Sequence, residues 1–228
     1  MKRSEINEQL KWAKNLIEKN NIKLPPFGYW EMAEWRKKID ETGTIREVML
    51  GWDITDYGED NFETLGAVLF TIRNGSLDDE SIGTPYAEKL ILLKEGQKLP
   101  NHYHASKTED IINRGGGILA IKLYNSNEDG TVDYESKVTI EMDGIKHIVN
   151  AGEEVLIEHG CSITLRPFQY HLFWAKEGEG DLVIGEVSSI NDDLTDNYNA
   201  REISRFSEVV EDEEILHPLC NEYGKIFK

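Results

Sequence analysis

Two histidines and a glutamate lie close together between Pro100 and Asp110. His102 and His104 are two residues apart, so in an extended chain both imidazoles point to the same side. Glu109 comes five positions after His104, and a turn between them would bring its carboxylate to the same point. Two imidazole nitrogens and a carboxylate suit Mn, Fe, Co, Ni or Zn and leave coordination positions open. The stretch therefore predicts a catalytic metal site, with an exposed loop that happens to carry two histidines as the alternative.

The glycines around these residues extend the pattern. The spacing resembles the first motif of the cupin superfamily at every spaced position, namely Gly96, His102, His104, Glu109 and Gly116. The resemblance implies a β-barrel and a fourth metal ligand, a histidine from a later strand.

Three later histidines are candidates for the fourth ligand, and we favour His171. It follows a proline turn and opens an apolar run in which alternation points His171 and Phe173 the same way. His147 follows an Asp-Gly hairpin signal and is expected to face water, and His159 precedes a glycine at the next turn. Both stay open as alternatives. The local pattern, Pro-x-Gln-x-His, is one residue shorter than the usual second cupin motif and lacks its glycine.

From about Gly66 the chain reads as short β-rich runs separated by Asn-Gly, Asp-Gly and other glycine turns. Many short strands with tight turns predict a sandwich or barrel, and an open-mouthed barrel would gather residues from distant strands. We therefore predict an all-β fold, a cupin barrel of the jelly-roll type. The predicted strands are Ala67–Arg73, Ala87–Leu93, Ile118–Tyr124, Val138–Met142, Ile145–Val149, Val155–Ile157, Ser162–Leu165, Leu172–Ala175 and Leu182–Val187.

The first forty residues have a helical pattern instead. Ser4 is predicted to cap a helix that stops at Leu24-Pro25-Pro26, and a second helix is predicted from Tyr29 to Ile39. We expect residues 1–40 to be a helical cover on the barrel or on a second subunit, residues 66–190 to be the barrel core, and residues 1–228 to be one domain.

Composition excludes some partners. The formal charge of −18 argues against nucleic acid and anionic membranes, which need a basic face. No apolar run approaches the ~20 residues that span a bilayer. Cys161 and Cys220 are too few for a disulfide framework, and no leader opens the chain, so a cytoplasmic location is expected. The acidic run Glu208–Glu214 is predicted to be solvated surface, and Gly115–Gly117 a turn between strands.

A closer resemblance is carried by longer segments, namely Gly51–Thr55, Leu69–Gly75, Tyr86–Lys89, Glu109–Gly117, Gly185–Ser189, Asn191–Asp193 and Leu219–Tyr223. Over nearly the whole chain the sequence resembles the D-lyxose isomerase family of cupins. It implies a metal-dependent aldose–ketose isomerase for D-lyxose and D-xylulose, often also D-mannose and D-fructose, with Mn²⁺ as the usual metal, Co²⁺, Fe²⁺, Ni²⁺ or Zn²⁺ as others, and a homodimer. Its metal ligands carry over to His102, His104, Glu109 and His171.

The isomerase chemistry assigns further roles. A base must remove the C2 proton of an aldose and return a proton to C1 through an enediol. Glu186 is our candidate, because a carboxylate within the apolar run Leu182–Val187 asks for a local role. Pairing with Lys or Arg inside the barrel is the alternative, and related cupin sugar isomerases have a glutamate at what looks like this position. Glu109 is expected to share the proton transfer.

Four other residues are candidates for contacts with the sugar. Lys107, two residues before Glu109, is expected to contact the developing oxyanion or the hydroxyls, with an exposed loop lysine as the alternative. Lys89 and Arg205 are expected to bind sugar oxygens, and Asp192 either does the same or caps a turn.

Other functions use similar residues. The same ligands would serve an iron(II) cupin dioxygenase, which would consume oxygen, because the ligand set does not identify the metal or the reaction. A non-catalytic sugar-binding cupin would bind without turnover and would not need Glu186. A phosphosugar isomerase needs a basic phosphate pocket, and no cluster of Arg or Lys beyond the N-terminal helices supplies one.

Overall fold

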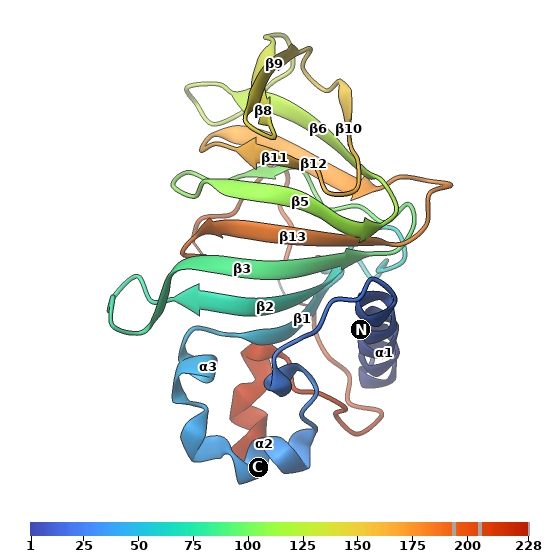
Figure 1. Cartoon of the computed structure of the whole chain (residues 1–228), viewed down its shortest axis with the longest axis vertical. Coiled ribbons are helices and arrows are strands. Elements are labelled where there is room, and N and C mark those ends of the chain that lie inside the picture. Colours follow the sequence, from blue (N-terminus) through green and yellow to red (C-terminus); the bar gives the residue numbers. More distant parts are fainter. Residues whose placement is uncertain (193–194, 205–206, 228) are drawn as a thin grey trace.

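Two antiparallel β-sheets enclose the main hydrophobic core in the computed structural model, which describes residues 1–192, 195–204 and 207–227. Figure 1 shows the strands of the larger sheet stacked along the long axis of the molecule. The larger sheet contains, in spatial order, β1 (Gly51–Thr55), β2 (Ala67–Gly75), β3 (Gly83–Leu93), β13 (Leu182–Ser189), β5 (Glu109–Gly116), β11 (Ser162–Leu165), β8 (Val138–Met142) and β9 (Ile145–Val149). The smaller contains β10 (Glu154–Ile157), β6 (Leu119–Ser126), β12 (Gln169–Ala175), β4 (His102–Tyr103) and β14 (Tyr198–Asn199), with β7 (Val132–Asp133) beside β6.

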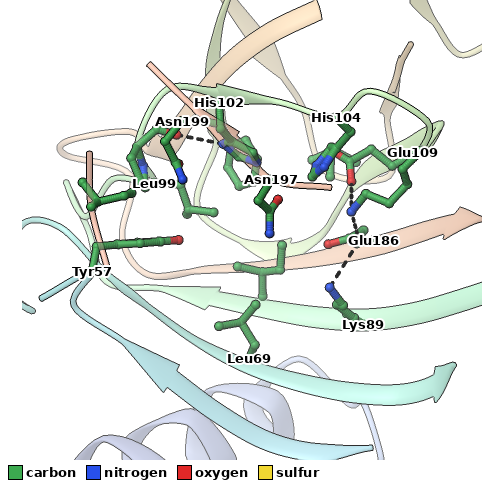
Figure 2. Close-up of a pocket in the computed structure, with 16 residues that line it drawn as sticks. Tyr57, Leu69, Lys89, Leu99, His102, His104, Glu109, Glu186, Asn197 and Asn199 are labelled. Atoms are coloured by element: carbon green, nitrogen blue, oxygen red, sulfur yellow. Dashed lines mark hydrogen bonds and ion pairs between the residues drawn. The ribbon is translucent and has the colours of Figure 1, made fainter. Parts of the chain in front are cut away.

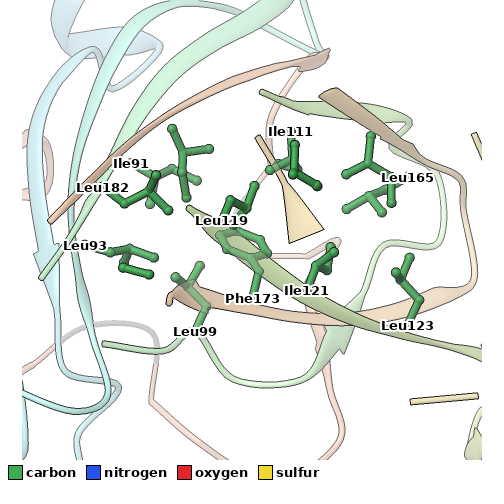
Figure 3. Close-up of a cluster of buried hydrophobic side chains, with 14 of the residues drawn as sticks. Ile91, Leu93, Leu99, Ile111, Leu119, Ile121, Leu123, Leu165, Phe173 and Leu182 are labelled. Atoms are coloured by element: carbon green, nitrogen blue, oxygen red, sulfur yellow. The ribbon is translucent and has the colours of Figure 1, made fainter. Parts of the chain in front are cut away.

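Alternation along the strands separates the core from one polar end of the barrel. Successive side chains of a strand point to opposite faces, so every second residue faces inward. On β13, Leu182 and Ile184 are fully buried in the core, and the next inward position is Glu186. β3, β5 and β12 repeat this arrangement. Their inward series are Lys89-Ile91-Leu93, Glu109-Ile111 and His171-Phe173-Ala175, and the apolar members are part of the core cluster in Figure 3. Polar residues therefore gather at one end of the barrel, above a packed apolar layer.

Every predicted strand is present, with boundaries within a few residues. Five strands, β1, β4, β5, β7 and β14, are absent from the predicted set. Three of these have only two residues each, and β5 has polar side chains where alternation would place apolar ones, because it carries Glu109. β1 and β14 extend the two sheets beyond the predicted core range of 66–190.

The first helix, α1 (Arg3–Lys19), packs its predicted apolar face on the outside of the larger sheet. Ile6, Leu10 and Ile17 are buried in a cluster with strand residues such as Val68 and Phe70. The predicted cap at Ser4 is wrong, because the helix starts after Lys2 and the Ser4 hydroxyl donates to Asp212 instead, at 2.8 Å. The helix also ends before the predicted proline stop. No helix among the described residues is long and apolar enough to cross a membrane.

The predicted helix from Tyr29 to Ile39 is present only as the short α2 (Met32–Lys37). Single 3₁₀ turns lie on each side of it, η1 (Pro26–Gly28) and η2 (Ile39–Glu41), and α3 (Gly43–Glu47) follows. Trp35 on α2 packs against Tyr223 of η3 (Cys220–Phe227), with ring centroids 4.8 Å apart. Figure 1 shows these short helices together beyond β1.

The acidic residues of the run Glu208–Glu214 are exposed, as predicted, and the run also binds α1. The fully buried Arg3 donates from Nε to Glu211 at 2.9 Å and from Nη2 to Glu222 of η3 at 2.6 Å. The hydrogen bond from Arg3 is the largest cause that lowers the pKa of Glu211 to about 2. The run therefore joins the two ends of the chain.

Stability between pH 5 and 7 is expected to depend on His217. This buried histidine donates from Nδ1 to the Trp30 carbonyl at 2.8 Å, and its Nε2 lies 2.8 Å from the Lys14 ammonium. Burial lowers the pKa of His217; the bond to Trp30 opposes this, and the Lys14 charge adds to it. Below about pH 6.5 the unfolded chain binds a proton here more readily than the folded chain does, so this contribution to stability is complete above that pH and is lost as the pH falls, by up to about 1.4 kcal/mol per unit.

Denaturant unfolding of wild type and His217→Gln from pH 5 to 7.5 tests this expectation. The pH dependence should be shallower in the variant, whereas His159→Gln, at an exposed histidine, should keep the wild-type slope. Equal slopes in wild type and His217→Gln would contradict it.

Candidate metal and acid–base site

Three histidines from different parts of the chain meet at the polar end of the barrel. His102 on β4 is the register partner of His171 on β12, and His104 follows β4 on the same side as His102. The Nδ1 atoms lie 2.9, 2.6 and 3.0 Å from the carbonyl oxygens of Pro100, Asp196 and Gln169, for His102, His104 and His171 respectively. A carbonyl oxygen only accepts, so each Nδ1 carries the hydrogen and each Nε2 carries a lone pair.

These imidazoles fit a divalent metal. Their potential ligand atoms all lie within 4.8 Å of one another. Nε2 of His171 is buried and has no hydrogen-bond partner among the described residues, which is costly for a buried acceptor unless a further group binds it. Burial lowers the pKa of His102 well below its usual range, and His171 and His104 lower it further. Neutral imidazoles with fixed tautomers are the form that binds metal.

Glu109, at the start of β5, lies between the histidines and a lysine. Its Oε1 is 3.3 Å from Nε2 of His171 and 3.5 Å from Nε2 of His104, and its Oε2 is 2.7 Å from the Lys107 ammonium. Burial acts to raise the pKa of Glu109, but Lys107 and the histidines outweigh it and hold the pKa well below its usual range. The carboxylate is therefore charged and within reach of a metal at the histidines.

The loop between His104 and Glu109 is held by Asp196, which the sequence analysis did not single out. Its carboxylate accepts from the backbone N–H groups of Ala105, Ser106 and Lys107 at 2.8, 3.1 and 3.0 Å. Its own carbonyl orients His104. Asp196 therefore fixes both a ligand histidine and the turn that brings Glu109 back to it.

Glu186 faces the same space from β13. It is 5% exposed, and its Oε1 lies 3.0 Å from the Lys107 ammonium and 3.7 Å from that of Lys89, its register partner on β3. Figure 2 shows Glu186, Glu109 and Lys89 at one end of a common cavity, beside His104. The carboxylate is thus paired with lysines, which is the alternative considered for Glu186 in the sequence. It also borders the cavity, which is what a base requires.

The cavity has a volume of about 230 Å³. Its far end is formed by side chains that sequence reasoning did not identify, among them Tyr57, Asn197 and Asn199. Figure 2 shows Tyr57 pointing its hydroxyl inward from the end opposite Glu186 and Lys89. The asparagines flank Tyr198 of β14, which stacks on Tyr103. A small polar molecule could therefore bind with one end at the histidines and the other at Tyr57.

A family model described as D-lyxose isomerase matches residues 1–223 of this chain. The chain belongs to the D-lyxose isomerase family. A D-lyxose/D-mannose isomerase of Serratia proteamaculans is 40% identical over 225 residues, and one of Escherichia coli O157:H7 is 42% identical over 228 residues. Each alignment covers 98% of this chain and 98% of the relative. Membership makes the chain a sugar isomerase and confirms the resemblance found in the sequence.

Solved structures of L-ribose isomerases have a similar fold. The enzyme of Cellulomonas parahominis with L-ribose matches with a TM-score of 0.59 at 15% identity, over 92% of this chain and 98% of that one. The enzyme of Acinetobacter sp. DL28 matches with a TM-score of 0.57 at 13% identity, over 89% and 93% of the two chains. These likenesses show the fold alone, and the predicted cupin barrel with an N-terminal helical extension is confirmed.

In this D-lyxose isomerase family member the structure brings most of the predicted site residues together. His102, His104, Lys107, Glu109, Glu186 and Lys89 line the cavity, and His171 lies beside it. His147 and His159, the alternative ligands, are both exposed and away from this group.

The other two predicted sugar contacts are placed differently. Asp192 lines a neighbouring cavity and accepts from the backbone N–H of Thr195 at 3.1 Å, which is the turn-capping role considered as its alternative. Arg205 lies outside the described residues. The residue before Asp192 is the one that reaches the site, since Oδ1 of Asn191 lies 2.5 Å from the Lys89 ammonium.

Proposed function

We propose that this chain is a metal-dependent aldose–ketose isomerase that interconverts D-lyxose with D-xylulose and D-mannose with D-fructose. The observation that carries the proposal is the placement of a buried carboxylate, Glu186, in a cavity lined by two of three convergent histidines, with the third, His171, beside it. The names of the two curated relatives support the choice of sugars.

His102, His104, His171 and Glu109 would hold the metal. Mn²⁺ is our first choice, on the family resemblance, and Co²⁺, Fe²⁺, Ni²⁺ and Zn²⁺ suit the same donors. When bound, a divalent cation acts as a Lewis acid toward the oxygens on C1 and C2 of the sugar. Glu109 has a second task, because its Oε2 fixes the Lys107 ammonium at 2.7 Å.

Glu186 performs the proton transfer. It removes the proton from C2 of the open-chain aldose and returns it to C1, while the hydroxyl proton of O2 moves to O1, passing through a cis-enediol in which negative charge develops on the oxygens. Lys107 and Lys89, on either side of this carboxylate, donate hydrogen bonds to those oxygens. The group is buried, which keeps water from weakening these interactions.

The far end of the cavity binds the rest of the sugar chain. With C1 and C2 at the histidines and Glu186, the hydroxyls of C4 to C6 extend toward Tyr57 (Figure 2). An aldohexose is one carbon longer than an aldopentose, so its chain extends further toward Tyr57.

Tyr57→Phe is therefore expected to lower kcat/KM for D-mannose more than for D-lyxose. Loss of one hydrogen bond corresponds to about a 2- to 10-fold fall in the mannose-to-lyxose ratio. Tyr134→Phe, at a tyrosine that is 66% exposed, is the matched control and should keep the ratio. An unchanged ratio in Tyr57→Phe would remove Tyr57 from the sugar site.

A homodimer and a cytoplasmic location complete the proposal. The family resemblance supports the dimer, and two free cysteines, Cys161 and Cys220, are compatible with a reducing compartment. Light scattering on the eluting protein should give twice the mass of the 26.1 kDa chain.

Conversion of D-lyxose by purified, chelator-stripped protein tests the proposed activity. Ketose formation should return on addition of Mn²⁺ and proceed equally under air and nitrogen. Oxygen consumption with Fe²⁺ would indicate the dioxygenase instead. Sugar binding without turnover, with any divalent metal, would indicate a binding protein.

A further inference from the structure

Asn191 contacts both lysines of the site through one atom. Its Oδ1 lies 2.5 Å from the Lys89 ammonium and 3.4 Å from the Lys107 ammonium. A carboxamide oxygen has two lone pairs, so it can accept from both donors at once. Lys89 is closer to this oxygen than to Glu186, which is 3.7 Å away. The position of Lys89 is therefore set by the amide as well as by the carboxylate.

The backbone that presents Asn191 is itself fixed by a buried side chain. Asn74, near the end of β2 and 8% exposed, accepts from the N–H of Asn191 at 3.0 Å and donates to its carbonyl at 3.2 Å. Asn74 also donates to the Val48 carbonyl at 3.4 Å. One amide thus holds both backbone polar groups of Asn191, so the position of Asn191 beside Lys89 and Lys107 is fixed from its backbone.

A neutral acceptor such as the Asn191 amide suits a position beside the ammonium groups of Lys89 and Lys107. Among the described residues, Lys89, Lys107, Glu109 and Glu186 are two positive and two negative side chains within one contact network. A carboxylate in place of the Asn191 amide would hold the ammonium groups equally well but would cancel part of their charge. The amide orients them and leaves that charge to act on the oxygens of the reacting sugar.

We propose that Asn191 is a positioning residue, which holds the ammonium groups of Lys89 and Lys107 beside Glu186, and that Asn74 fixes Asn191. The inference rests on the proposed isomerase function. The sugar is neutral when it binds and gains negative charge during proton transfer, so well-placed ammonium groups act mainly on the transition state. Loss of the contacts from Asn191 to the two lysines should therefore change kcat more than KM.

The test is steady-state kinetics of the full-length, metal-loaded protein with D-lyxose. Asn191→Leu should lower kcat about 10- to 100-fold, with KM within about 3-fold of wild type and unchanged metal content. Asn191→Asp keeps an acceptor oxygen in place, so its kcat should lie between those of wild type and Asn191→Leu. Asn74→Ala should lower kcat in the same direction with both lysines intact. Asn7→Ala removes a buried asparagine that braces the 213–216 segment far from the site, and it should lower stability alone.

Acylation of lysines by a small anhydride, read by mass spectrometry, adds a measurement that needs no turnover. Lys89, which is 3% exposed, should react several-fold faster in Asn191→Leu than in wild type, with no change at Lys176 on the surface. Wild-type kcat in Asn191→Leu, equal losses in Asn191→Leu and Asn191→Asp, or unchanged labelling of Lys89 would each overturn the inference. If the wild-type protein converts no aldose but labelling of Lys89 still rises in Asn191→Leu, the proposed function is overturned. The positioning of Lys89 by Asn191 is then still supported.

Discussion

Replacing Glu186 by Gln is expected to lower kcat for D-lyxose by about 10²- to 10⁴-fold while the metal content stays at the wild-type level. Gln has nearly the same shape and can still accept from Lys107, 3.0 Å from the present Oε1, but it cannot take up the C2 proton. The histidines and Glu109 are untouched, so the metal donors remain. KM should change little, since the neutral sugar does not need the base in order to bind.

Metal analysis and steady-state kinetics on the same preparation measure both quantities. Glu88→Gln is the matched control, because Glu88 lies on the neighbouring β3 and pairs with Arg73 at the outer surface of the same sheet. That variant should keep the wild-type kcat. If Glu186→Gln turns over at a near-normal rate, Glu186 is only a structural partner of the two lysines, and Glu109 becomes the candidate base.

The convergence of His102, His104 and Glu109 could be predicted from the sequence because these residues are local. His102, His104 and Glu109 fall within eight consecutive residues, where strand geometry alone fixes which side chains point together. His171 needed a longer inference, that an apolar strand after a proline turn would lie beside the first motif. The register pairing of His171 with His102 is the placement that this inference required.

Residues that act through distant loops were not predictable in the same way. Asn191 and Asp196 are common loop residues, and no spacing indicates that one meets Lys89 and the other the backbone of residues 105–107. Both contacts span about a hundred positions, and only the folded barrel brings their ends together. Asp192, the residue chosen from this segment, has a carboxylate that suggests function more readily than the amide beside it.

A hydrogen-bonding group distant in the sequence also explains why the predicted N-cap of the first helix is wrong. Serine is a preferred N-cap residue, so the local sequence favours Ser4 as the cap. Asp212, more than two hundred positions away, accepts from both the N–H and the hydroxyl of Ser4, at 2.9 and 2.8 Å. Two charge-assisted hydrogen bonds outweigh one cap, so the helix begins earlier.

His171→Ala is expected to remove both metal and activity. His171 is 1% exposed, and its Nε2 makes no hydrogen bond among the described residues although Oε1 of Glu109 lies 3.3 Å away, so a cation bound between these two atoms would be a ligand of both. Loss of one of the four proposed ligands should lower metal affinity by more than about 10-fold, because even changes to groups that only hydrogen-bond to the ligands have effects of that size. Added Mn²⁺ should raise the melting temperature of wild type, as any ligand of the native state does, and should raise that of the variant far less.

Elemental analysis after dialysis and thermal melts with and without Mn²⁺ measure these effects. His147→Ala and His159→Ala, at exposed histidines, are the controls and should keep both the metal and the Mn²⁺-dependent shift. A full metal load in His171→Ala would mean that His102, His104 and Glu109 suffice. Loss of metal in His147→Ala would place the fourth ligand on β9, against its exposed position in the barrel. Because the removed imidazole also packs on Phe173, an unfolded His171→Ala would be replaced by His171→Gln, which fills the space and is expected to lose metal in the same way.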